Sequence, residues 1–167
     1  MKEMIVRYTG YNVWANKMII DTMQALPLSA LAIESESSFP TLRDTALHVW
    51  SAELVWLLRL KKISNPVWAQ DVFIGTFREL AANWQRESAA LHELAQSLGD
   101  AELAAPFSFA TRNGTPYTMP VADVIMHVCN HSTYHRGQLV TQLHAAGATK
   151  IPGTDYLNYA ALLAKNS

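Results

Sequence analysis

The chain has 167 residues, of which 50% are apolar and 16% are charged, so it can bury a large core and is not intrinsically disordered. Its length predicts one domain over residues 1–167. Thirteen basic and fourteen acidic side chains give a formal charge of −1, without the basic surplus that binding to phosphates requires. We therefore expect no nucleic-acid partner.

The apolar runs are too short or too interrupted for export or membrane insertion. Residues 4–6 form too short a run for a signal peptide. The most apolar stretch, Leu47–Leu60, is broken by His48, Glu53 and Arg59. We therefore expect a soluble, cytoplasmic protein without a membrane partner. Cys129 is the only cysteine, so a metal would have to be bound through nitrogen or oxygen, for which six histidines are available.

Three long helices are predicted in the first 100 residues. Apolar side chains recur at helical spacing from Tyr8 until Pro27 ends the first helix. A second helix begins after Pro40 and ends before the polar segment at residues 64–66. A third helix begins at Phe73, and its apolar residues follow a spacing of threes, fours and sevens. The predicted ranges are 8–26, 41–60 and 73–98.

The pattern then changes between Pro106 and Pro116. Phe107 and Phe109 alternate with small polar residues, and the following dipeptide Asn113-Gly114 suits the positive φ angles of a tight turn. These features predict a small β-hairpin or a structured loop.

A fourth long helix follows this insertion. Thr118 can cap it, Pro120 is tolerated in its first turn, and its apolar pattern continues to His144. A short helix over residues 155–165 is expected to pack against the bundle. The predicted fold class is all-α: a four-helix bundle with a small β-hairpin or loop insertion before the fourth helix and a short C-terminal helix.

The fourth helix carries three histidines at four-residue intervals. At about 100° per residue, His131 and His135 lie within the apolar stripe centred on Val128, and His127 lies at its edge. Imidazoles at positions i and i+4 can share one divalent cation. The alternative is a pair of core histidines that each bond to a carbonyl or hydroxyl group. The segment is not a zincin motif, because no glutamate follows the first histidine of the pair.

A third ligand should come from another helix, and His48 is the candidate. It lies on a strip of small and polar residues that faces either a polar pocket or water, and periodicity alone favours water. His92 competes with it, but His92 lies among charged neighbours and is expected to be solvated. His144 lies outside the buried stripe.

Two sequence signatures resemble those of the DinB family of DinB/YfiT-like metalloenzymes. The first is Leu47-His48-Val49-Trp50 followed by Glu53, and the second is the segment from Asn130 to Gln138 that contains His-Ser-Thr-Tyr-His-Arg-Gly-Gln. The segment Tyr11 to Asn16 is similar to the first-helix pattern of the family. This resemblance implies a four-helix bundle in which His48, His131 and His135 hold a divalent metal ion, with His127 as an additional nearby histidine.

Three imidazoles leave a coordination position open, and an ion held by them suits zinc, nickel or iron chemistry. The leading hypothesis is a metal-dependent enzyme that acts on a small molecule through an activated thiol or water. Some family members resemble transferases that use a low-molecular-weight thiol, and others resemble hydrolases. One alternative is a non-catalytic, stress-related helical bundle that binds metal and ligand. Another is a structural or interaction protein that needs no metal.

Several other polar residues have interpretations of their own. Cys129 is interpreted as a partly buried apolar residue, and Arg136 as a structural residue that pairs with a neighbouring helix or orients a group near the metal. Tyr134, Glu53 and Asp44 are candidates for acid-base groups or for groups that contact the metal ligands.

The apolar character of Leu47–Leu60 around most of its circumference predicts association. Part of this surface should meet a second chain, which gives a homodimer. The alternative is that the segment around Asn113-Gly114 and the C-terminal helix cover this surface within one chain.

Overall fold

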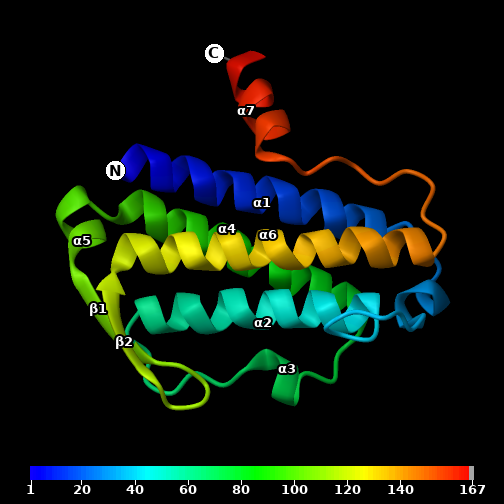
Figure 1. Cartoon of the computed structure of the whole chain (residues 1–167), viewed down its shortest axis with the longest axis horizontal. Helices are drawn as coiled ribbons and strands as arrows, with labels where there is room; N and C mark the ends of the chain where they lie inside the picture. The colour runs from blue at the N-terminus through cyan, green and yellow to red at the C-terminus, as the bar shows by residue number, and fades with distance from the viewer. Residues whose placement is uncertain (166–167) are drawn as a thin grey trace.

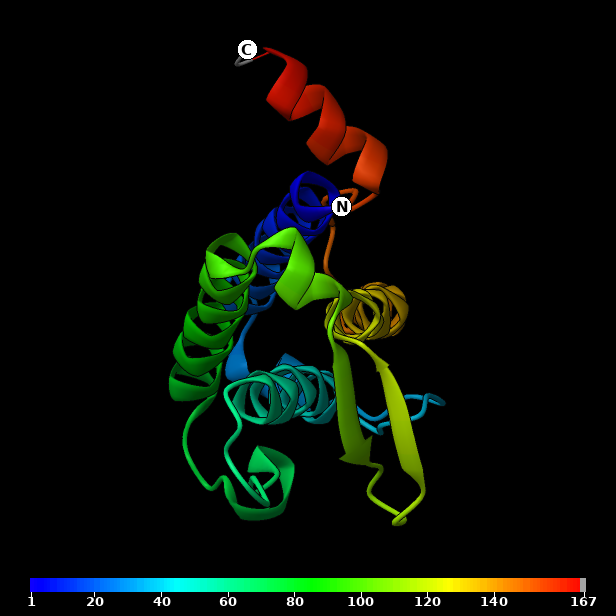
Figure 2. The same ribbon diagram turned by 90° about the vertical axis from the view of Figure 1, so that its left-hand side faces the viewer.

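The computed structural model describes residues 1–165, in which four long helices lie side by side around a common core (Figure 1). An end-on view shows the four helices at the corners of a quadrilateral (Figure 2). The long helices are α1 (Lys2–Gln24), α2 (Leu42–Leu60), α4 (Phe77–Ser97) and α6 (Val121–Ala145). This arrangement confirms the predicted all-α, four-helix-bundle class.

Shorter elements connect the long helices. A 3-10 turn, η1 (Leu28–Ala32), follows α1, and a single helical turn, α3 (Ala69–Val72), lies between α2 and α4. Helix α5 (Asp100–Ala104) leads into an antiparallel hairpin of β1 (Pro106–Ala110) and β2 (Pro116–Pro120). Helix α7 (Tyr156–Lys165) follows the bundle. The hairpin before α6 and the short C-terminal helix are therefore also confirmed.

The apolar stripes predicted from the sequence meet in the centre of the bundle. Trp84, Leu80, Ile19 and Leu139 have no exposed surface, although they come from three different helices. Burial of side chains of this size contributes about 1.5–3 kcal/mol each, which exceeds what helix propensity alone supplies. No helix within residues 1–165 combines the length and apolar character that are needed to cross a bilayer.

Two predicted helix starts are wrong. Helix α1 already begins at Lys2, well before Tyr8. Helix α4 begins at Phe77 and not at Phe73, because Thr76 forms a capping box in which its hydroxyl oxygen accepts from the amide of Glu79. Phe73 lies outside the helix and packs edge-on against Trp50, with the ring centroids 4.9 Å apart.

The expected cap of α6 is also wrong. Thr118 lies on β2 and bonds through its hydroxyl to Ser108 on β1, since the second strand of the hairpin continues to Pro120. The prediction of positive φ angles at Asn113-Gly114 is confirmed for Gly114 alone, which has a φ of 87°, whereas Asn113 keeps a negative φ in a loop that joins Ala110 to Pro116. The C-terminal helix makes aromatic contacts with α1 but buries none of its residues, so it covers less of the bundle than expected.

A polar network crosses the apolar core and includes all four long helices. Glu53 of α2 is fully buried, and its Oε1 accepts from Nδ2 of Asn12 at 2.8 Å and Nδ2 of Asn16 at 2.7 Å. Arg136 of α6 is 1% exposed, and its Nη1 donates to Oδ1 of both asparagines at 2.7 Å. Two asparagine side chains of α1 therefore bridge one buried carboxylate and one buried guanidinium.

Two hydroxyl groups complete the contacts of the carboxylate. Ser88 of α4 donates to Oε2 of Glu53 at 2.5 Å, and Ser132 of α6 donates to its Oε1 at 2.7 Å. Arg136 also stands over the ring of Tyr11, with its Cζ 5.2 Å from the centroid. The structural role predicted for Arg136 is thus confirmed, and Glu53 is a buried member of the same network.

Removal of Arg136 should strongly destabilise the fold. The Arg136→Met variant leaves the Glu53 carboxylate without its counter-charge in a buried site, and we expect a loss of about 3–5 kcal/mol in the free energy of unfolding. Urea denaturation of the variant and of the wild-type protein measures this difference in the free energy of unfolding. The matched control is Lys17→Met, which removes an exposed ion pair with Asp21 and should cost under about 1 kcal/mol. A similarly small cost for Arg136→Met would contradict this account of the core.

Candidate metal centre

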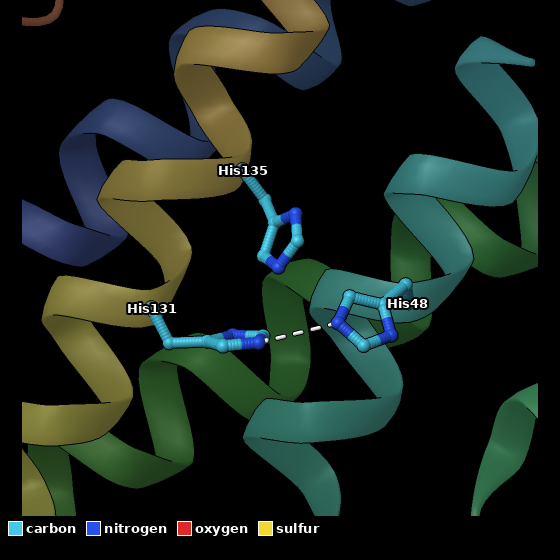
Figure 3. A group of neighbouring side chains, drawn as sticks. All are labelled: His48, His131 and His135. Atoms are coloured by element: carbon cyan, nitrogen blue, oxygen red, sulfur yellow. Dashed lines mark hydrogen bonds between the residues drawn. The ribbon is translucent and has the colours of Figure 1, made fainter. Parts of the chain in front are cut away.

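Three histidines from two helices converge at one edge of the bundle. His48 extends from α2, and His131 and His135 extend from successive turns of α6 (Figure 3). One nitrogen from each ring can be chosen so that all three lie within 4.8 Å of one another. The three side chains therefore form a cluster that could hold a metal ion.

The orientation of α6 follows from its consecutive residues. His131 precedes Ser132 and His135 precedes Arg136, and neighbouring residues on a helix project about 100° apart. Because Ser132 and Arg136 bond within the core network, the two histidines face the groove between α6 and α2. The buried network thus sets the direction in which the imidazoles point.

Two glutamine side chains fix the imidazole tautomers. Oε1 of Gln70 lies 2.9 Å from Nδ1 of His48, and Oε1 of Gln138 lies 2.7 Å from Nδ1 of His135. An amide oxygen only accepts, so each Nδ1 carries the proton and each Nε2 presents a lone pair. Contacts of this kind orient metal-binding histidines in proteins.

Phe39, in the segment before α2, covers the cluster. Its ring stacks on His48 at a centroid distance of 4.2 Å and lies 5.7 Å from His135. Gln138 donates from Nε2 to Oγ of Ser38, and Gln142 donates to the carbonyl of Phe39, so α6 holds this segment in place. The ring limits the access of water to one side of the histidines.

Burial keeps the three imidazoles neutral. It lowers the pKa of His131 from 6.5 to about 3, and the neighbouring imidazoles add to this effect. Burial also lowers the pKa of His48 and of His135, although the hydrogen bonds that they donate to Gln70 and Gln138 oppose it. Since only neutral imidazole binds a metal ion, the cluster is in its ligand form at neutral pH.

The separation of the ring nitrogens fits a shared ion. Nε2 of His48 and Nε2 of His131 lie 3.2 Å apart. Two nitrogens that bind one ion tetrahedrally at about 2.0–2.1 Å lie about 3.3 Å from each other. A cation between them would also satisfy the lone pair that the bond to Gln70 leaves on His48.

The other histidines lie outside this cluster. His127 packs against Trp56, and its ring centroid is 6.0 Å from that of His131. His92 was predicted to be solvated but is half-buried, because its Nδ1 bonds to Oγ1 of Thr9 at 2.8 Å. His144 is exposed near the end of α6. The helical spacing predicted that His48 faces water. This prediction is wrong, since the ring of His48 lies beneath Phe39.

The remaining candidates have structural or peripheral positions. Cys129 is fully buried, which raises the pKa of its thiol and disfavours a thiolate. Asp44 bonds to Thr41 at the start of α2. Tyr134 is 65% exposed, and its ring meets that of His135 edge-on at 5.0 Å. Of these residues, only Tyr134 borders the cluster.

Sequence reasoning missed three residues around the cluster. Gln138 lies three residues after His135 and therefore on the same face of α6, a spacing that could have identified it. Gln70 and Phe39 lie in connecting segments, and no periodic pattern places them beside a helix far away in the chain.

Acid should destabilise the metal-free protein through His131. Its folded pKa is about 3, whereas an unfolded histidine has a pKa of about 6.5, so the unfolded chain binds the proton first as the pH falls. The contribution of neutral His131 to the free energy of unfolding is thus fully present above about pH 6.5. Below that pH it declines, by up to about 1.4 kcal/mol per pH unit. Urea denaturation between pH 7.5 and 5 should show a smaller slope for His131→Gln. Equal slopes in both proteins would contradict the assignment.

Comparison with known proteins places the chain in one family. The chain is 25% identical over 165 residues to Protein DinB of Bacillus subtilis (strain 168), with 93% of each chain covered. Its fold is similar to the crystal structure of a DinB-like protein from Bacillus cereus ATCC 10987, with a TM-score of 0.71, 22% identity, and coverage of 90% of this chain and 95% of that one. The DinB family model matches residues 1–165. This chain, with its bundle and three-histidine cluster, therefore belongs to the DinB family.

Proposed function

We propose that this protein is a divalent-metal-dependent enzyme that acts on a small molecule, with His48, His131 and His135 as the metal ligands. The observation that carries the proposal is the convergence of three neutral imidazoles from two helices within 4.8 Å. Two core histidines with carbonyl or hydroxyl partners would not need to face one another, yet His48 and His131 do.

The ligand set suits a catalytic site better than a structural one. Structural zinc sites use four protein ligands, whereas sites with three leave a position for water or substrate. No cysteine thiolate is available to complete a closed site, because the single cysteine is not part of the cluster and burial raises the pKa of its thiol. Imidazole ligands are compatible with zinc, nickel or iron as the resident ion.

A divalent ion at such a site lowers the pKa of a bound water or thiol toward neutrality. The protein itself contributes orientation and shielding. Gln70 and Gln138 hold the Nδ1 protons of two ligands, and Phe39 limits the entry of bulk water. We propose transfer to a low-molecular-weight thiol, or hydrolysis, as the reaction class. The names of the two similar proteins mention no reaction or ligand, so the reaction class depends on this chemistry alone.

Purified protein should contain about one divalent ion per chain. His48→Ala, His131→Ala and His135→Ala should each weaken metal binding by more than about 100-fold, because each removes one of three ligands and the loss of a group that only orients a ligand already costs about 10–100-fold. Elemental analysis after gel filtration gives the occupancy. Full occupancy in the His48→Ala protein would rule out that residue as a ligand.

Several variants serve as controls for this prediction. His92→Ala and His144→Ala should retain the metal, since neither residue is in the cluster, and His127→Ala should retain it as well. Gln138→Ala should lie between the two groups, since loss of an orienting partner costs about 10–100-fold in affinity.

Metal-loaded protein should then be screened for thiol transfer and hydrolysis. A metal-loaded protein without turnover in either screen would favour ligand binding without catalysis.

We also propose that the chain forms a homodimer in the cytoplasm, the location expected from its sequence. Every residue of α2 is buried or half-buried within one chain, so α2 offers less surface to a second chain than its apolar sequence predicts. Several exposed apolar side chains lie beside the N-terminus and α7: Met1, Met4, Met126 and Tyr156 line one hollow, and Leu157 is 76% exposed. A second chain that covers these side chains would remove them from water.

Light scattering tests the dimer. At micromolar concentration the mass should be twice the 18.6 kDa of one chain. Leu157→Lys should shift the protein toward the monomer, because it places a charge in the interface. A mass of one chain at every concentration would exclude the dimer.

A further inference from the structure

A second hollow lies at the C-terminal end of α2, and one of its arginines, Arg112, is linked to His48 of the histidine cluster through Asp71 and Gln70. It has a volume of about 570 Å³, within the range of small-molecule sites. The loop that follows α2 forms one wall and the hairpin forms the other, where the hairpin passes the C-terminal end of α2 (Figure 1). Six side chains define its character: Arg59, Lys62, Trp68, Phe107, Phe109 and Arg112. We call it the basic groove.

The basic groove concentrates positive charge in a chain whose net charge is −1. Arg59, Lys62 and Arg112 line it, and none of the described residues that line it is acidic. The nearest carboxylate is Asp71, which accepts from Nη2 of Arg112 at 2.9 Å and offsets part of that one charge. Two further positive charges face the hollow without a carboxylate in its lining.

The two arginines are held in place before any ligand arrives. Cζ of Arg59 stands 4.8 Å from the ring of Trp56, and its Nη2 donates to the carbonyl of Ala110 at 3.0 Å. Cζ of Arg112 stands 5.4 Å from the ring of Trp68. The bond of Arg59 to Ala110 and the bond of Arg112 to Asp71 each use only part of a guanidinium, which has five N–H donors. A fixed guanidinium suits bidentate contact with a carboxylate or phosphate group.

The loop that carries Lys62 has two residues in the left-handed backbone region. Lys62 has a φ of 61° and Asn65 a φ of 50°. Asparagine adopts the left-handed region readily, and Lys62 adopts it because the chain leaves α2 there: the amide of Ile63 donates to the carbonyl of Leu58, and the amide of Lys62 donates to the carbonyl of Arg59. The sharp turn places Lys62 on the same hollow as Arg59.

Contacts along two sides connect the basic groove to the histidine cluster. On one side Arg112 pairs with Asp71, which follows Gln70, the partner of His48. On the other side Trp56, beneath Arg59, contacts the ring of His127 at 5.4 Å, and His127 lies next to His131. Only Asp71 and Gln70 separate Arg112 from His48, so a molecule bound at Arg112 lies close to the cluster.

We propose that the basic groove binds the carboxylate or phosphate group of an anionic small-molecule substrate, whose other end reaches the histidine cluster. This inference rests on the proposed function and further specifies that the substrate is negatively charged. The aromatic side chains Trp68, Phe107 and Phe109 in the groove suit an apolar portion next to the anionic group.

Binding of three probes to the full-length protein tests the proposal by calorimetry. Succinate and inorganic phosphate carry the two kinds of anionic group, and succinamide is a neutral molecule of the same size as succinate. Succinate, phosphate or both should bind, and which of them binds identifies the group. Arg59→Gln and Lys62→Gln should each weaken this binding about tenfold, the effect of losing one charge-assisted hydrogen bond. Lys62 is exposed, so its variant should fold even if the Arg59 variant does not.

The matched control is Lys61→Gln, which removes an adjacent exposed lysine that does not line the groove and should change affinity less than about twofold. Metal-free protein prepared with a chelator tests the metal site separately and should bind the anion with unchanged affinity. The proposal is overturned if neither anion binds, if succinamide binds equally well, or if Lys61→Gln is as damaging as Lys62→Gln. It is also overturned if removal of the metal abolishes binding, because the anion would then be held by the metal.

Discussion

The bundle depends on one pair of opposite charges buried in its core. Glu53 and Arg136 come from different helices, and the two asparagines of α1 bridge them. A buried charge without its partner costs several kcal/mol, so the helices must take the one rotation in which every contact forms. Apolar packing alone specifies the rotation of α6 less sharply, because apolar side chains of suitable size can repack while the core stays apolar. The network therefore gives the core its specificity.

That rotation has a direct consequence for chemistry. Ser132 and Arg136 point into the core, so His131 and His135, one residue earlier in each case, point toward α2. His48 lies on the adjoining face of α2, five residues before Glu53. The same two helices thus supply the network and the cluster, and rigid positioning of ligands is a requirement for a metal site that keeps an open position. The connecting segments with Phe39 and Gln70 complete the surroundings of the cluster from outside the bundle.

The sequence predicted the elements that local chemistry determines. Thr41 begins α2 as expected because its hydroxyl caps the helix, and Gly114 allows the hairpin turn. Local signals failed where pairing with a distant residue decided the outcome. Threonine is a common helix-capping residue, but Thr118 pairs with Ser108 across the hairpin. His92 was expected to be solvated but bonds to Thr9 of another helix. Likewise Asn12 and Asn16 resemble surface residues until Glu53 and Arg136 are placed beside them. The histidine cluster could be identified from helical spacing together with the family signatures, whereas Phe39 and Gln70 could not.

X-ray absorption spectroscopy of the zinc-loaded protein tests the central claim most directly, because it reports the atoms bound to the ion. The account predicts three nitrogen ligands at about 2.0–2.1 Å with the multiple scattering of three imidazole rings, and a further light atom in the open position. A shell of oxygen atoms without imidazole scattering would contradict it. So would a shell with only one or two imidazoles, since the cluster of His48, His131 and His135 would then not act as a single site.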